Sequence, residues 1–315
     1  MNYEVSYHSE RGARPMNQDR VAIAERDNAV LLVVADGLGG HRGGEIAAEI
    51  LTQTIVHAFQ TVRGPVINRP SAFLALGILQ AHQAILRRTM ASVADIQPRT
   101  TCILCLVQNG YAYWAHVGDS RLYHFRHGRL VQRTQDHSTV EELRKDGLLT
   151  EEEMRSHPQK GKLTKCVGGP NKPTIALGEE TLLARDDVLL LCSDGVWEAH
   201  APEDLERYFS RQRSLDDTVS EMLGSAEHKM ADGCDNISAA CLRWLEDLPL
   251  ALPLQGNASM HVDEHTFIGG TAANTRNAPK AQENPAARSD SEPERNIADE
   301  IRELEQYLRS REPKP

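Results

Sequence analysis

Two stretches of the chain share a pattern that limits what it can fold into: an apolar run that ends on Asp-Gly. Residues 30–35 lead into Asp36-Gly37, and residues 188–193 lead into Asp194-Gly195. Short apolar runs without polar alternation are typical of strands buried on both faces. A buried carboxylate is costly to ionise unless an opposite charge compensates it. The pattern therefore predicts a positive charge near the ends of two core strands.

A third carboxylate, Asp235, stands just before the apolar run at residues 237–245. The sequence around the three aspartates offers no basic residue beside them, which favours a bound cation cluster. Ligand sets made only of oxygen prefer hard ions, so Mg²⁺ or Mn²⁺ is expected rather than zinc or copper. Cys102 and Cys105 form a CxxC, but they lie in a predicted strand where residues three apart point to opposite faces. We therefore expect reduced core thiols.

Nearly all the apolar periodicity falls within residues 1–246, which we expect to form one α+β domain. Asn109-Gly110 and His127-Gly128 between apolar runs indicate hairpins, and tight hairpins require antiparallel pairing. Many hairpin-linked strands with a few amphipathic helices favour a layered α+β domain over a βαβ winding. The expected strands are 3–8, 20–24, 29–35, 100–107, 111–117, 121–126, 129–134, 174–182, 187–193 and 236–244. The expected helices are 43–60, 71–90, 202–210 and 215–230.

A polar insertion at about residues 136–170 interrupts this domain. Ser138 with Glu141, and Thr150 with Glu153, have the spacing of capping boxes at helix N-termini. The insertion is therefore predicted to contain two short helices, the second ending before a proline. Its charged, glycine-containing composition is typical of a mobile surface flap.

The character of the chain changes from about residue 247. Residues 247–295 are rich in small and polar residues and are predicted to be a disordered linker. Residues 296–311 recover an amphipathic pattern, which fits either a frayed tail helix or a docking contact for a protein partner. Thr266 lies in an acidic context that fits a phosphorylation site or a ligand for a phosphothreonine-binding domain, but the preferred interpretation is that it has no function.

Bulk properties narrow the classes of function. The formal net charge of −10 argues against binding nucleic acid. No apolar run reaches the roughly 20 residues that cross a bilayer, and the N-terminus does not have the pattern of a signal peptide. We expect a cytoplasmic monomer that associates with neither nucleic acid nor membrane.

Six segments stand out in order along the chain: R-x-x-N-Q-D at residues 14–19, V-A-D-G-L-G-G-H at 34–41, G-D-S-R at 118–121, L-T-K-C-V-G at 163–168, C-S-D-G-V-W at 192–197 and D-N-I-S at 235–238. In order and spacing they resemble the motifs of bacterial metal-dependent serine/threonine protein phosphatases, the PPM or type 2C family. The resemblance covers roughly residues 5–245.

The resemblance implies a four-layer α-β-β-α sandwich, in which two antiparallel β-sheets are flanked by helices. It also implies hydrolysis of phosphoserine and phosphothreonine in proteins, with two Mn²⁺ or Mg²⁺ ions as cofactors. In that scheme Asp36 bridges both ions and the Gly37 carbonyl binds one of them. Asp194 and Asp235 complete the other site, and Asp19 acts through a metal-bound water.

Two further roles follow from the resemblance. Asp119 is the candidate ligand of a third, weaker metal ion, and Arg14 would clamp the substrate phosphate with its planar donor fork. Each assignment has a structural alternative. Aspartate before glycine is common in turns, and Arg14 has the alternative of being an ordinary surface charge. His41 is offset from the histidine of eukaryotic relatives and stays unassigned, whereas Arg121 fits a structural salt bridge better than a phosphate ligand.

Three interpretations of function fit these motifs, and the first is favoured. It is a phosphatase that acts on the phosphoprotein substrates of serine/threonine kinases. The second is an enzyme of the same fold devoted to one regulatory protein. The third is an inactive scaffold that binds phosphoproteins, which would not need its metal-binding aspartates. The chain contains no Cys-x5-Arg loop, so a cysteine-dependent phosphatase is disfavoured.

Overall fold

The computed structural model describes residues 1–38, 43–90, 97–211 and 213–247. The chain divides into two compact units, Met1–Leu254 and Gln255–Pro315, and every described residue belongs to the first. The linker predicted from 247 onward, the helix predicted at 296–311 and His41 lie outside the described residues, apart from residue 247 itself.

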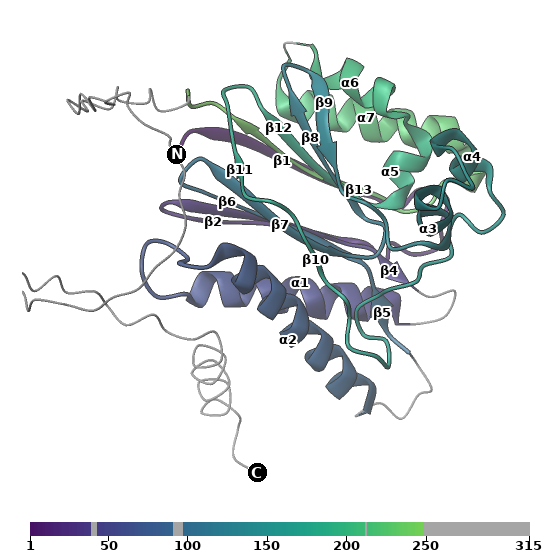
Figure 1. Cartoon of the computed structure of the whole chain (residues 1–315), viewed down its shortest axis with the longest axis horizontal. Helices are drawn as coiled ribbons and strands as arrows, with labels where there is room; N and C mark the ends of the chain where they lie inside the picture. Colours follow the sequence, from purple (N-terminus) through teal and green to yellow (C-terminus); the bar gives the residue numbers. More distant parts are fainter. Residues whose placement is uncertain (39–42, 91–96, 212, 248–315) are drawn as a thin grey trace, which may run out of the picture. The chain divides into compact units, whose positions relative to one another are not determined.

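Two antiparallel sheets form the centre of the first unit (Figure 1). The first sheet has the order β1 (Tyr3–Glu10), β13 (Ile237–Trp244), β12 (Val188–Cys192), β8 (Arg121–Arg126), β9 (Arg129–Arg133). The second has the order β10 (Ala176–Leu177), β7 (Tyr111–Val117), β6 (Cys102–Gln108), β3 (Ala29–Ala35), β2 (Arg20–Arg26), with β11 (Thr181–Leu182) also on β7. A small pair joins β4 (Gly37–Leu38) to β5 (Arg99–Thr100).

Helices cover the outer face of each sheet. The helices α1 (Gly44–Thr61) and α2 (Pro70–Met90) pack on the second sheet, as Figure 1 shows. The first sheet is covered by α5 (Asp194–Ala199), α6 (Pro202–Phe209) and α7 (Leu215–Met230), with a 3₁₀ turn at Ala231–Gly233 after α7. The four-layer α-β-β-α sandwich expected from the sequence is therefore confirmed.

Strand β3 shows why its sequence is apolar throughout. Its odd-numbered residues Leu31 and Val33 pack under the helices α1 and α2, while Leu32 and Val34 pack between the two sheets. Both faces of the strand are therefore buried, as the run without alternation predicted. Burying one such side chain contributes roughly 1.5–3 kcal/mol relative to leaving it exposed.

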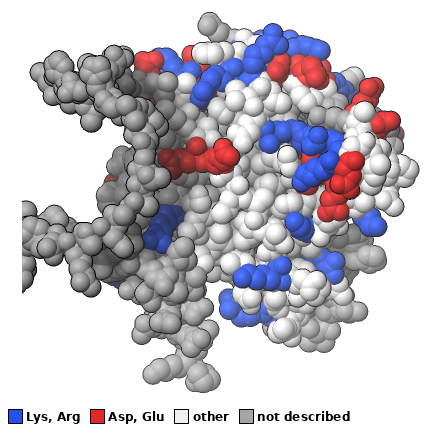
Figure 2. All heavy atoms as spheres, viewed as in Figure 1, with Lys and Arg blue, Asp and Glu red and all other residues white. Residues whose placement is uncertain are grey.

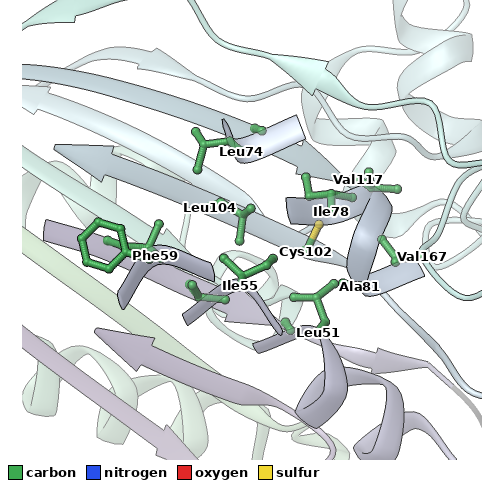
Figure 3. Close-up of a cluster of buried hydrophobic side chains, with 14 of the residues drawn as sticks. Leu51, Ile55, Phe59, Leu74, Ile78, Ala81, Cys102, Leu104, Val117 and Val167 are labelled. Atoms are coloured by element: carbon green, nitrogen blue, oxygen red, sulfur yellow. The ribbon is translucent and has the colours of Figure 1, made fainter. Parts of the chain in front are cut away.

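Figure 3 shows the helix-facing part of this core. Leu51 and Ile55 of α1 lie close to Ile78 of α2, over Leu104 and Cys102 of β6. Cys105 belongs instead to the cluster between the sheets. The two cysteines of the CxxC thus point to opposite faces as predicted, and all six cysteines are free.

The insertion at 136–170 contains both predicted helices, α3 (Thr139–Lys145) and α4 (Glu151–Ser156). Ser138 caps α3 by accepting a hydrogen bond from the third helical backbone amide. Thr150 and Glu153 form a complete capping box at α4. Local hydrogen bonding therefore set these helix starts, as the spacing of the capping residues indicated.

One element differs from the expectation. The strand predicted at 174–182 forms only β10 and β11, which both pair with β7, and Gly178 between them lies against the ring of Trp114, where a Cβ would be 2.0 Å from the indole nitrogen. The structural alternative for Asp194, a simple turn, is not what the structure shows. Asp194 lies in the first turn of helix α5, whose N-cap residue is Ser193.

Candidate active site

Strands of both sheets deliver the predicted acidic residues. Asp36 directly follows β3 in the second sheet, and Asp194 follows β12 in the first after one intervening residue. Asp235 precedes β13, the neighbour of β12 in the first sheet. All three are half-buried rather than fully exposed.

The backbone of Asp36 is held by two threonines. Its carbonyl oxygen accepts hydrogen bonds from the Thr101 backbone amide at 2.8 Å and from Thr100 Oγ1 at 2.9 Å. Its amide donates to Thr101 Oγ1 at 3.2 Å. Gly37 is required beside it, because a Cβ there would lie 2.5 Å from the backbone of Gly44. This close approach orients Asp36 at the end of β3.

Asp19 is the most deeply buried of the candidate aspartates, with 2% of its surface exposed. Ser193 Oγ donates to Asp19 Oδ2 at 2.8 Å. Burial raises the pKa of Asp19 to about 6, hydrogen bonds with Ser193 and Ser238 oppose that rise, and the charge of Asp235 adds to it. Two hydroxyl partners hold this buried carboxylate in place. It could therefore serve as a structural hydrogen-bond acceptor or as an acceptor for a metal-bound water.

The carboxylates influence one another. Burial raises the pKa of Asp36, and the charges of Asp194 and Asp19 raise it further. Burial likewise raises the pKa of Asp194, with added repulsion from Asp119 and Asp235. Like charges in a weakly solvated region disfavour ionisation together, so the group favours a compensating cation.

Asp119 follows β7 and is buried. Burial raises its pKa to about 7, the charge of Asp136 raises it further and Arg121 opposes the rise. Its backbone oxygen accepts a hydrogen bond from Trp197 Nε1 at 3.0 Å. The preceding Gly118 has φ of 106° and packs against Thr101, so the turn tolerates no side chain there.

Arg14 lies in the loop between β1 and β2. Its Nη2 atom is 2.6 Å from Asp235 Oδ2, and 57% of its side chain is exposed. The hydrogen bond and the charge of Asp235 raise its pKa, so it remains a guanidinium cation. The structure therefore brings Arg14 to the acidic cluster with its fork accessible.

Arg121 is structural, as its sequence context indicated. It forms a two-pronged salt bridge to Asp136 at 2.8 and 2.7 Å, and its guanidinium stacks on Trp197 at 3.7 Å. This buried pair joins the start of the insertion at 136–170 to α5. A second contact to the same helix comes from Lys160 of the insertion, which pairs with Glu198 at 2.8 Å.

The sequence motifs contained several of these supporting residues without revealing what they do. Ser193, Ser238 and Asn236 stand beside the aspartates in the C-S-D-G and D-N-I-S segments. Their contacts link segments far apart in the chain, so no local spacing could have predicted them. Their adjacency to a candidate ligand was the available signal.

The donor set fits hard divalent cations, because it consists of carboxylate oxygens and a backbone carbonyl. Within the described ranges, no three acidic, histidine or cysteine side chains already converge on one point. The observation that favours a metal is electrostatic, because these buried and half-buried carboxylates disfavour one another's ionisation. Figure 2 shows basic and acidic side chains scattered together over the visible face, so the described part of that face is not a block of one sign.

Comparison with solved structures places this fold among the bacterial serine/threonine phosphatases. The Streptococcus agalactiae serine/threonine phosphatase matches with a TM-score of 0.71 and 31% identity, over 78% of this chain and 100% of that one. The Mycobacterium tuberculosis phosphatase PstP/Ppp matches with a TM-score of 0.67 and 28% identity, over 78% and 99%. A structure of the PstP catalytic domain in complex with two manganese ions matches with a TM-score of 0.66 and 26% identity, over 78% and 99%.

The Protein phosphatase 2C family model matches residues 6–233, and the chain belongs to that family. Protein phosphatase PhpP of Streptococcus pneumoniae is 31% identical over 235 residues, covering 74% of this chain and 94% of the relative. The serine/threonine phosphatase stp of Listeria welshimeri is 29% identical over 240 residues, covering 74% and 93%. The protein is accordingly a hydrolase, a protein serine/threonine phosphatase.

None of the helices in the described part of the chain is long and apolar enough to cross a membrane.

Proposed function

We propose that the acidic cluster binds two divalent cations, Mn²⁺ or Mg²⁺, for the hydrolysis of phosphoserine and phosphothreonine. Asp36, the Gly37 carbonyl, Asp194 and Asp235 are the proposed direct ligands, and Asp19 is proposed to act through a bound water. The placement of Asp36 and Asp194 at the ends of core strands from the two sheets is the single observation that carries this proposal, and a cation would relieve the repulsion that raises the pKa of both groups. The manganese complex of the related PstP domain supports it.

Asp119 is proposed as the ligand of a third and weaker ion. Burial and the neighbouring Asp136 hold its pKa near 7, so at neutral pH it is only partly ionised without a cation. Arg121 nearby already opposes that shift. Because Arg121 already supplies positive charge beside Asp119, a cation would relieve less repulsion there than in the Asp36 group.

When bound, a pair of such ions activates a water nucleophile and neutralises charge on the phosphoryl group. The residues of the chain bind and orient the substrate. Arg14 offers a planar donor fork that matches two phosphate oxygens, and its charge persists at every pH of interest. Asp235 holds this fork at the edge of the acidic cluster until a phosphate competes for it.

The proposal is tested by turnover of a phosphothreonine peptide with added Mn²⁺. Asp36→Asn and Asp194→Asn should each lower kcat by at least roughly 100-fold, because each removes charge that stabilises the transition state through the cation. Asp27→Asn, at an exposed position in the turn between β2 and β3, is the matched control and should leave turnover unchanged. Full turnover by either site variant would refute the proposed site.

Calorimetric titration with Mn²⁺ separates this enzyme from an inactive phosphoprotein-binding scaffold. The proposal requires saturable Mn²⁺ binding to the wild-type chain that Asp36→Asn weakens. A scaffold would bind the phosphopeptide equally well with and without the metal. Absence of Mn²⁺ binding would therefore contradict the metal-dependent mechanism.

We further propose that residues 1–246 are the catalytic unit, that the flap at 136–170 borders the site, and that the natural substrates are phosphoproteins made by serine/threonine kinases. The ion pair between Lys160 and Glu198 supports the flap assignment, because it joins the flap to the helix that begins with Asp194.

Affinity purification with and without residues 247–315 tests the proposed role of that region in binding a partner. Identical sets of partners would contradict it.

A further inference from the structure

The side chain of Asn236 closes the loop that carries Arg14. Its Nδ2 atom donates to the Arg11 carbonyl at 2.8 Å and to the Met16 carbonyl at 3.0 Å. Its Oδ1 atom accepts from the Gln18 backbone amide at 2.9 Å. One amide group therefore ties both ends of the loop at residues 11–18 to the start of β13.

The orientation of this amide follows from its partners. With the oxygen and nitrogen exchanged, the oxygen would face two carbonyl oxygens and the nitrogen would face a backbone N–H. Asn236 is 6% exposed, so solvent could not satisfy the mispaired groups. Aspartate would meet the same repulsion, because a carboxylate has no N–H to donate. The position therefore requires an amide of this length.

Two more contacts fasten the same loop. The Ala13 amide donates to the Cys234 carbonyl at 3.1 Å. Gly12 has φ of 59° and lies so close to the Asp235 carbonyl that a Cβ would be 2.1 Å from the oxygen. The backbone is thus fixed on both sides of Arg14 while the side chain of Arg14 stays exposed, and Met16 is 50% exposed as well.

We propose that Asn236 is a positioning residue for phosphate recognition, acting through Arg14. The inference rests on the proposed function, in which Arg14 binds the substrate phosphate. Arginine has a long side chain whose ordering costs conformational entropy, so a fixed loop lowers the cost of aligning its fork. Asn236 supplies that fixed base without touching the substrate.

The test is a double-mutant cycle with Asn236→Ala, Arg14→Ala and the double variant, measured on the phosphothreonine peptide and by inhibition with inorganic phosphate. We expect Asn236→Ala to raise KM and the phosphate inhibition constant by roughly 10- to 100-fold, since a charge-assisted contact depends on alignment. In the Arg14→Ala background the same substitution should change neither value. Effects that simply multiply would overturn the proposal.

Asn236 could instead act on catalysis by positioning the neighbouring Asp235, and Mn²⁺ calorimetry distinguishes that effect from one through Arg14. The proposal expects the Mn²⁺ affinity of Asn236→Ala to stay within about twofold of wild type, a difference below 0.5 kcal/mol. Weakened Mn²⁺ binding together with an effect that persists without Arg14 would assign Asn236 to the metal site instead. Asn28→Ala, exposed in the β2–β3 turn, is the control.

Limited trypsin digestion measures how firmly the loop at residues 11–18 is held, and it does not depend on phosphatase activity. Cleavage after Arg11 should be slow in the wild type and at least several-fold faster in Asn236→Ala, at a temperature well below the melting temperature of either protein. Asn236→Ser, which keeps one hydroxyl donor, gives the same readout if the alanine variant does not fold. Equal cleavage rates in the wild type and the variant would contradict the proposal that Asn236 holds this loop in place. If the wild-type protein hydrolyses no phosphopeptide, that result counts against the proposed function. The digestion would still show whether Asn236 fixes the loop.

Discussion

The raised pKa of Asp119 predicts that this carboxylate destabilises the metal-free protein near neutral pH. Asp119 is 4% exposed, and burial with the charge of Asp136 raises its pKa from 3.8 to about 7. In the unfolded chain the group ionises near 3.8. Between these two values the folded state binds more protons than the unfolded state, so stability falls as pH rises through this window. Stability from this group is fully present only below pH 3.8.

The size of the effect follows from the same displacement. One pH unit corresponds to about 1.4 kcal/mol, so ionised Asp119 costs about 4 kcal/mol at pH 8. At pH 5, where the folded group is still protonated, the cost is about 2 kcal/mol. Asp119→Asn removes the charge and keeps the shape. In chelator-treated protein it should therefore raise the free energy of unfolding by about 4 kcal/mol at pH 8 and about 2 kcal/mol at pH 5.

The measurement is urea-induced unfolding with excess chelator at both pH values, for wild type, Asp119→Asn and the exposed control Asp27→Asn. A stabilisation that grows between pH 5 and pH 8 in Asp119→Asn alone supports the reasoning. Saturating Mn²⁺ should reduce or reverse the gain if Asp119 binds an ion. Destabilisation by Asp119→Asn at pH 8, or a gain independent of pH, would refute it.

Three further predictions concern the same unit. Gly12→Ala should lower the free energy of unfolding by more than about 2 kcal/mol, because its Cβ would overlap the Asp235 carbonyl and its φ is positive, as urea unfolding would measure. Ser193→Ala removes a hydrogen bond that favours ionised Asp19, so the pH midpoint of Mn²⁺ binding should move upward in calorimetric titrations. Removal of residues 248–315 should leave kcat and the melting temperature of the domain unchanged.

Each of these has a control and a contrary outcome. A Cβ added at Gly64 would have no atom within 4 Å, so Gly64→Ala is the control. Equal losses of unfolding free energy in the two glycine variants would contradict the packing argument for Gly12. Ser193→Thr keeps the hydroxyl and should restore the pH midpoint; a midpoint unmoved by alanine would remove Ser193 from the site. Loss of activity on truncation would contradict residues 1–246 as a sufficient catalytic unit.

Local patterns in the sequence predicted most of the elements. The apolar run of β3, the hairpin at Asn109-Gly110 and the cap of α4 by Thr150 each depend on residues a few positions apart. Such short-range preferences act in the same way in any fold. The strand expected at 174–182 is interrupted at Gly178, which lies against Trp114 of β7, a neighbour 64 positions away that local spacing does not reveal.

Some features of the candidate site were predictable from the sequence, and others depend on the packed structure. The identity of the aspartates, their glycine neighbours and their places at strand ends were readable from the chain, and the family motifs joined them into one hypothesis. Their burial, their mutual repulsion and the helix that begins at Asp194 required the packed sheets. A pKa depends on surroundings that a linear sequence does not specify.

By itself, the sequence determined an α+β chain of antiparallel strands with acidic residues at the ends of buried runs. Only the tertiary structure decided which groups meet there: Ser193 with Asp19, which are 174 positions apart, and Asn236 with Arg11, which are 225 apart. The physical reason is that hydrogen bonds form over about 3 Å, so they depend on how the two sheets stack and not on distance along the chain.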